Sequence, residues 1–161
     1  MESEDVLLII SLMGAHKSSA GVQELGCSAL LSLALKAENQ ALIRSKGGIE
    51  AVVRAMGAHG PSAGVLEAGC GALANFAMDD KNEADIRAKG GIKTVVRAMG
   101  AHESSAGVQS KGCLELNNRV FNVEDQGPFA AKGGIEVGKV RKMGFQGAVG
   151  GMFSEEDEGV E

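Results

Sequence analysis

Three cysteines and three histidines are the residues of this chain best suited to chemistry, and each set recurs at one spacing. Successive members are 43 residues apart: Cys27, Cys70 and Cys113, and His16, His59 and His102. Thiolates and imidazoles bind zinc, and thiolates carry redox chemistry. The first hypothesis is therefore a metal-binding or thiol-dependent enzyme or sensor.

The spacing itself argues against that chemistry. Side chains that recur once in each packed unit sit on helices whose axes are about 8–10 Å apart. A disulfide needs Cα atoms within about 7 Å, and no Cys-x-x-Cys pair typical of zinc is present. Each histidine follows Gly-Ala in a predicted loop, where a loop or capping role is favoured and a pH-sensitive or metal-contacting edge is the alternative. We predict half-buried structural thiols, no metal and no cofactor.

Paired glycines share the same step and raise a second hypothesis, a phosphate-binding loop. The pairs are Gly47-Gly48, Gly90-Gly91 and Gly133-Gly134. A phosphate loop needs a preceding strand and a Gly-Lys-Ser/Thr sequence, which these pairs lack, so they are predicted to be turns. No Ser/His/Asp set or distinctive carboxylate pair appears either, and we predict that the protein is not an enzyme.

A period of 43 residues is typical of proteins built from stacked repeats. Residues Gly47–His59 and Gly90–His102 are identical at 11 of 13 positions. The predicted organisation is a first copy at 1–46, a second at 47–89, a third at 90–132 with a degenerate second half, the start of a fourth at 133–143, and a glycine-rich then acidic disordered tail at 144–161.

Each copy is predicted to contain a medium helix, a loop, a long helix and a short helix, followed by the Gly-Gly turn. In the medium helix Ile49, Val52, Val53 and Met56 follow the i, i+3, i+4, i+7 pattern of one buried face. Gly57 is predicted to end this helix as a left-handed cap, as are Gly14 and Gly100 in the other copies.

The long helix is predicted to begin after a serine N-cap, at Ser19, Ser62 or Ser105. Glycine inside a helix costs about 1 kcal/mol relative to alanine. Gly26, Gly69 and Gly112 therefore indicate a close approach of two helices. The short helix is predicted near residues 39–45 and 82–88, with Ile43 and Ile86 pointing inward.

Charge is concentrated in the tail. Residues 154–161 hold five acids and no base, and subtracting these five from the 21 acids leaves 16, which equals the 16 bases. A neutral body argues against binding to nucleic acid or to an anionic membrane. The apolar run 6–13 follows acidic residues, which is the wrong charge for a signal peptide, and it is too short to span a membrane. Three cysteines without a leader predict a cytoplasmic or nuclear protein.

The residues Asn82–Val96, together with the long-helix segment Val65–Ala77, resemble the armadillo repeat family, although HEAT repeats share this length. The resemblance extends from about Val6 to Met143 and is clearest from Ser19 to Gly112. It implies an all-α, armadillo-like right-handed superhelix of about three repeats with incomplete ends. It also implies a non-catalytic module that binds a protein or peptide along the concave face of its long helices.

The resemblance also implies which residues would form that face. The position of the partner-binding asparagine corresponds to Ser32, Asn75 and Asn118. The position four residues earlier, a tryptophan in importin-type grooves, corresponds to Ser28, Gly71 and Leu114, and one turn further back lie Glu24, Glu67 and Ser110. The chain contains no tryptophan, so importin-like stacking is not expected.

The first copy is more apolar than the others, because Leu7 and Ser11 replace Glu50 and Arg54. An exposed apolar edge predicts self-association, pairing with a partner, or a chain cut from a longer solenoid. Two alternatives to a binding module therefore remain. One is a structural fragment of a larger solenoid with no binding role of its own, and the other is the Cys/His metal or redox sensor.

Overall fold

The computed structural model describes residues 2–120, with the side chains of residues 3–112 and 114. Within this range the secondary structure is entirely helical, which confirms the predicted all-α class. The later part of the third copy, the start of the fourth and the acidic tail lie outside the described residues. The helices are α1 (Glu2–Ala15), α2 (Ala20–Leu33), α3 (Ala37–Ser45), α4 (Gly48–Ala58), α5 (Ala63–Phe76), α6 (Asp80–Ala88), α7 (Gly91–Ala101) and α8 (Ala106–Val120).

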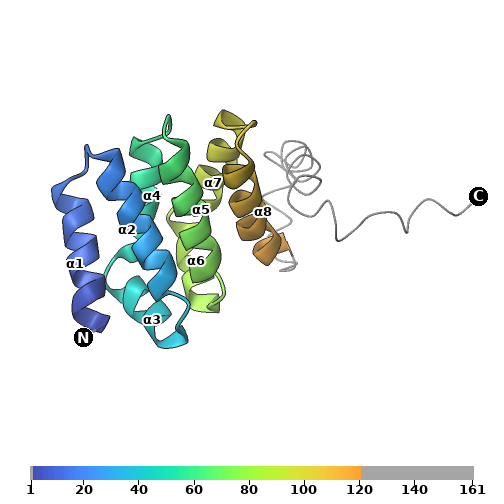
Figure 1. Cartoon of the computed structure of the whole chain (residues 1–161). Coiled ribbons are helices and arrows are strands. Elements are labelled where there is room, and N and C mark those ends of the chain that lie inside the picture. Colours follow the sequence, from blue (N-terminus) through green and yellow to red (C-terminus); the bar gives the residue numbers. More distant parts are fainter. Residues whose placement is uncertain (1, 121–161) are drawn as a thin grey trace, which may run out of the picture.

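The long helices α2, α5 and α8 lie side by side, and α5 packs against both of the others (Figure 1). The medium helices α1, α4 and α7 each pack on the long helix that follows them, with α4 and α7 behind the long helices in this view. The short helices α3 and α6 connect each long helix to the next medium helix. The same order of helices thus recurs along the stack.

The apolar stripes predicted from the sequence form the core. Ile49 and Val52 are fully buried, Met56 is nearly so, and Val53 is partly buried. In the short helices Ile43 and Ile86 are also fully buried, as predicted, and Phe76 is the largest side chain in the core. Each layer therefore buries one face of its helices against the next.

The chain turns sharply between short and medium helices at Gly47 and Gly90. Their φ angles are 83° and 78°, in the left-handed region that favours glycine. The next residue is also restricted, because a Cβ at Gly48 would lie only 3.0 Å from the carbonyl oxygen of Ile43. The prediction that the Gly-Gly pairs are turns is confirmed at these two positions, while Gly133-Gly134 lies outside the described residues.

Serine caps begin the long helices, as predicted. The hydroxyls of Ser19, Ser62 and Ser105 accept hydrogen bonds from the backbone N–H groups three residues later, at 3.3, 3.4 and 3.4 Å. Each bond satisfies one of the N–H groups that a helix N-terminus leaves without an intrahelical partner.

The predicted glycine caps of the medium helices are wrong. Gly14, Gly57 and Gly100 lie inside α1, α4 and α7, and among the described residues positive φ occurs only at Gly47 and Gly90. The helical hydrogen bonding continues past Gly57, because the N–H of His59 donates to Ala55 at 3.0 Å. The helix therefore ends at Ala58, one residue beyond the predicted glycine, with His59 as its C-cap.

The glycines inside the long helices do mark close helix approaches. A Cβ at Gly26, Gly69 or Gly112 would lie within 2.6 Å of a methionine Sδ in the preceding medium helix, that of Met13, Met56 or Met99 respectively. Those methionines are buried. The absence of a side chain on one helix thus provides the space for the long side chain of the other.

Candidate functional site

The predicted binding residues come from the three long helices. Glu24, Ser28, Ser32, Glu67 and Leu114 are exposed, Asn75 and Ser110 are partly buried, and Gly71 is buried. The backbone of Asn118 belongs to α8, but its side chain lies outside the described residues. We call the seven exposed or partly exposed residues the long-helix surface.

Gly71 contributes space for neighbouring side chains instead of a contact of its own. A Cβ there would lie 2.7 Å from Cδ1 of Leu31 on α2 and 3.6 Å from Cδ of Lys111 on α8. The side chains of Leu31 and Lys111 therefore lie over Gly71. The centre of the long-helix surface is therefore flanked by aliphatic chains.

Asn75 is tied into the stack. Its Nδ2 donates to the carbonyl oxygen of Leu31 in the neighbouring long helix at 3.3 Å, and its own carbonyl accepts from Nε2 of Gln40 at 3.4 Å. Ser32 donates to the carbonyl of Ser28 at 3.1 Å, within its own helix. The asparagine position implied by the resemblance thus already joins two copies before any partner is considered.

Glu24 and Glu67 lie against the first turn of the next long helix. A Cβ at Gly64 would be 2.7 Å from the carboxyl carbon of Glu24, and one at Gly107 would be 2.7 Å from Oε1 of Glu67. Helix N-termini favour nearby negative charge. These exposed carboxylates therefore help to join successive long helices while remaining accessible on the long-helix surface.

A polar network between the short helices was not predicted from the sequence. Nδ2 of the fully buried Asn82 donates to the carbonyl of Gln40 at 3.2 Å. Nη1 of Arg44 donates to Oδ1 of Asn82 and to Oδ1 of Asp79, both at 3.4 Å. Because buried polar groups need partners, this network fixes how α3 and α6 meet.

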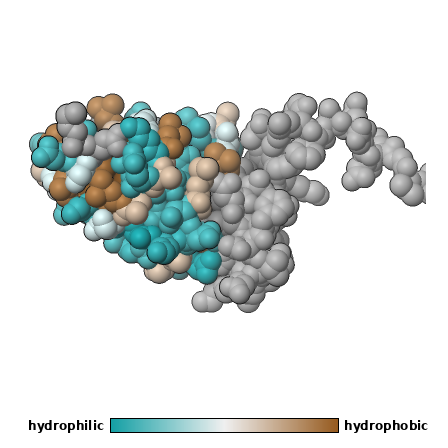
Figure 2. Space-filling view, turned by 90° about the horizontal axis from the view of Figure 1, so that it is seen from below, coloured by the Kyte–Doolittle hydropathy of each residue, from teal (hydrophilic) through white to brown (hydrophobic). Residues whose placement is uncertain are grey.

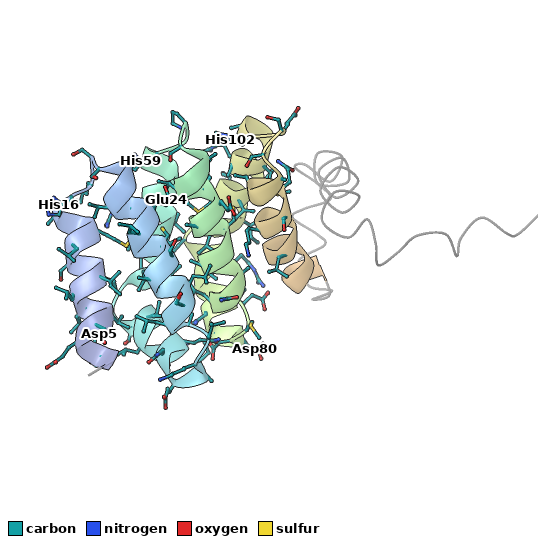
Figure 3. All side chains as sticks on the ribbon, viewed as in Figure 1. Asp5, His16, Glu24, His59, Asp80 and His102 are labelled. Carbon is teal, nitrogen blue, oxygen red and sulfur yellow. The ribbon has the colours of Figure 1, made fainter. Side chains whose placement is uncertain are left out.

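The histidines link consecutive loops along one edge of the stack, where Figure 3 shows all three. Nε2 of His59 lies 2.7 Å from the carbonyl of Lys17, and Nε2 of His102 lies 2.7 Å from the carbonyl of Gly60. Since a carbonyl only accepts, the imidazole donates. The histidines therefore lie in loops, as favoured, and also join successive copies by hydrogen bonds. Among the described residues no group of three metal-ligating side chains occurs.

The thiols of Cys27 and Cys70 are fully buried, so the prediction of half-buried thiols is wrong. Both are thiols rather than halves of a disulfide, and the side chain of Cys113 lies outside the described residues. Burial raises the pKa of the Cys27 thiol from 9.0 to about 12, because desolvation penalises the thiolate. A thiol that stays protonated near neutral pH is a poor nucleophile and a poor metal ligand.

A groove of about 360 Å³ lies between the second and third copies. Its walls include Gly60 and Pro61 from the loop after α4, and Thr94, Ala98 and His102 from α7 and its end. Thr94 and Ala98 therefore mark the side of a medium helix that faces the preceding copy. The sequence carried no signal for this groove, because its lining residues are distant in the chain.

A comparison of the chain with protein-family models, with curated proteins and with solved structures finds no match in any of the three. Among the helices between residues 2 and 120, none has both the length and the apolar character needed to cross a bilayer.

Proposed function

We propose that this protein is an armadillo-like, right-handed superhelix that acts as a non-catalytic protein-interaction module. The partner would be a protein or peptide segment lying along the long-helix surface. The supporting observation is the single layer formed by α2, α5 and α8, on which Glu24, Ser28, Ser32 and Glu67 are exposed to solvent. Extended surfaces of this kind are what stacked repeats use to bind partners.

The chemistry of the surface favours recognition by hydrogen bonds. Ser28 and Ser32 offer hydroxyl oxygens, and their small size allows a partner backbone to come close. Glu24 and Glu67 add two carboxylates, which favour hydrogen-bond donors or positive charge in the partner. The same carboxylates would repel phosphates, in agreement with the proposal that nucleic acid is not a partner.

Two alternatives make different predictions. A metal or redox sensor needs reactive thiols, and the raised pKa of Cys27 argues against this. A structural fragment with no binding role predicts that no interaction depends on the long-helix surface. The buried thiols also suit the reducing cytoplasm or nucleus, which we propose as the location.

The test introduces bulk and charge into the surface without touching the core. A partner is first captured by a photo-crosslinking residue at Ser28, and affinity is then measured for Ser28→Arg and Ser32→Arg. We expect each to weaken binding at least about tenfold with an unchanged melting temperature. The matched control is Ala58→Arg, which places the same side chain on an exposed position of α4.

Two results would contradict binding at the long-helix surface. One is that Ser28→Arg and Ser32→Arg bind the partner as tightly as the original chain does. The other is that the control, Ala58→Arg, loses as much affinity as they do. If no partner is crosslinked at Ser28 while the protein remains helical and soluble, the fragment alternative is the better account.

A further inference from the structure

A second surface lies at the first end of the stack, on α1. Along one side of this helix lie Asp5, Leu8 and Leu12, at i, i+3 and i+7, and His16 follows just beyond its end, at i+11. Leu8 is 58% exposed and Leu12 is 46% exposed. Figure 2 shows hydrophobic surface at the α1 end of the stack, and we call these four residues the α1 stripe.

The corresponding side of the other medium helices is an interface. Ala51 and Ala55 on α4, which match Leu8 and Leu12, are only 1% and 2% exposed. On α7 the matching residues, Thr94 and Ala98, line the groove shared with the loop of the preceding copy. The α1 stripe therefore has the orientation of a packing surface, and no described helix covers it.

Leu8 and Leu12 are too large for another copy to pack on α1 at the distance found between the medium helices of neighbouring copies. Alanine at positions 51 and 55 allows α4 to pack on α1, and threonine and alanine at 94 and 98 allow α7 to pack on α4. Leucine has three more carbons than alanine and is also larger than threonine, and interiors packed at crystal density do not absorb such an excess without strain. The stripe favours an occupant with a different packing distance.

The charges on the stripe indicate which occupant fits. Asp5 and its neighbour Glu4 are exposed at the start of α1, and His16 and Lys17 are exposed just beyond its end. Figure 3 shows Asp5 and His16 at opposite ends of the helix. The α1 stripe, with Glu4 beside it, thus has carboxylates at one end, an imidazole that can donate a hydrogen bond at the other, and leucines between them.

We infer that the α1 stripe docks on the α1 stripe of a second copy of this chain, antiparallel and related by a two-fold axis. In this arrangement Leu8 meets Leu12 of the partner subunit, because the axis passes midway between them. In the same register Glu4 lies opposite His16 of the partner subunit at each end, so a carboxylate faces an imidazole. Antiparallel pairing also sets each helix dipole against the opposite one. Since a two-fold contact uses the same patch on both chains, association ends at the dimer.

The first test measures the mass of the full-length chain by sedimentation across the micromolar range. We expect a monomer–dimer equilibrium that Leu8→Ala with Leu12→Ala weakens at least about tenfold, since this change copies the residues of α4 and removes exposed apolar surface. The helix should persist, because alanine has the higher helix propensity. Leu25→Ala is the control, at a leucine that is 73% exposed on α2.

The second test concerns the antiparallel arrangement. Glu4→Lys alone and His16→Asp alone should each weaken the dimer, because the first removes the carboxylate opposite the imidazole and the second places two carboxylates together. The double reversal should restore it to within about threefold of the original chain. A restoration of this kind is not expected if the leucines associate without a fixed orientation.

A monomer at all concentrations would overturn the inference, as would oligomers that grow beyond two. A double reversal no better than the single ones would overturn the antiparallel arrangement. The variants of α1 leave the long-helix surface unchanged, so failure here is distinguishable from failure of the proposed function.

Discussion

Met56 occupies the space that a side chain at Gly69 would need, and this pairing recurs at Gly26 with Met13. The glycine is conformationally ordinary, since it lies in a regular helix, so its role is purely one of space. A long, flexible methionine fits such a channel better than a branched side chain would. Residue pairs of this kind set the distance between medium and long helices.

Gly69→Ala should lower the free energy of unfolding. Overpacking costs about 1–3 kcal/mol, from which about 1 kcal/mol of improved helix propensity is recovered. Gly57→Ala is the matched control, because a Cβ there meets nothing within 4 Å, and it should stabilise the protein by about 0.5–1 kcal/mol. Chemical denaturation measures both, and a destabilised Gly57→Ala would mean that this residue does cap its helix.

The buried thiol of Cys27 makes stability depend on pH. Because its folded pKa of about 12 lies above its ordinary value of 9.0, the unfolded chain loses the proton first as pH rises. Stability is therefore full below pH 9 and falls toward pH 12, by about 1.4 kcal/mol between pH 8 and pH 10.

The measurement is the pH slope of urea unfolding, compared with that of Cys27→Ala. The variant is less stable at pH 8, because it leaves a cavity, but it should lose about 1.4 kcal/mol less between pH 8 and pH 10. Parallel slopes in the two proteins would show that the thiol is not desolvated.

At the scale of the element, local rules account for most helix boundaries. The periodic apolar residues predict the helices, and the serine hydroxyls start them as expected. The end of α4 was mispredicted because glycine after an apolar run is typical of a helix end, whereas the deciding factor is the hydrogen bond from His59 to Ala55. Such a bond is not encoded in the type of a single residue.

The turn between α3 and α4 depends on Gly47, whose φ is 83°. Gly47→Ala should destabilise the protein by about 1–2 kcal/mol, because a Cβ is unfavourable in the left-handed region. Gly47→Asn should cost less, since asparagine tolerates that conformation. Thermal unfolding shows which of the two variants is less stable. If both lose the same stability, the positive φ of Gly47 is not the cause.

At the scale of the whole molecule, contacts between copies hold the stack together. They involve the buried Asn82 and Gln40, the histidines of the loops, and the carboxylates of Glu24 and Glu67. Stability in such a stack is approximately the sum of the copies and of their interfaces. If one interface is lost, the copies on its two sides should therefore unfold independently of each other.

Asn82→Ala tests this interface. It leaves the carbonyl of Gln40 and the guanidinium of Arg44 without this partner, and should lower the free energy of unfolding by about 1–3 kcal/mol and broaden the transition. Lys81→Ala on the exposed side of α6 is the control and should change little. A sharp, unshifted transition for Asn82→Ala would show that the network does not couple the copies.

The candidate site was predictable only in part. Repetition places Ser32 and Asn75 on equivalent turns of α2 and α5, so their presence on neighbouring long helices follows from the sequence. That Asn75 bonds to Leu31, and that Gly71 lies under Lys111, could not be derived, because these contacts depend on the distance between helices. The burial of Asn82 could not be derived either, because polar side chains usually lie at the surface.

The histidine bonds have a consequence for how such a chain can lengthen. The second copy takes part in this hydrogen bond on both of its sides. Its His59 donates to the carbonyl of Lys17 in the first copy, and its Gly60 carbonyl accepts from His102 in the third. Its long helix also contacts both neighbours in the same way: Gly64 lies next to Glu24 of the first copy, and Glu67 lies next to Gly107 of the third. A duplicate of residues 47–89 inserted after residue 89 would meet the residues needed for these contacts on both sides. Gene duplication could therefore extend this protein by whole repeats without any compensating substitution.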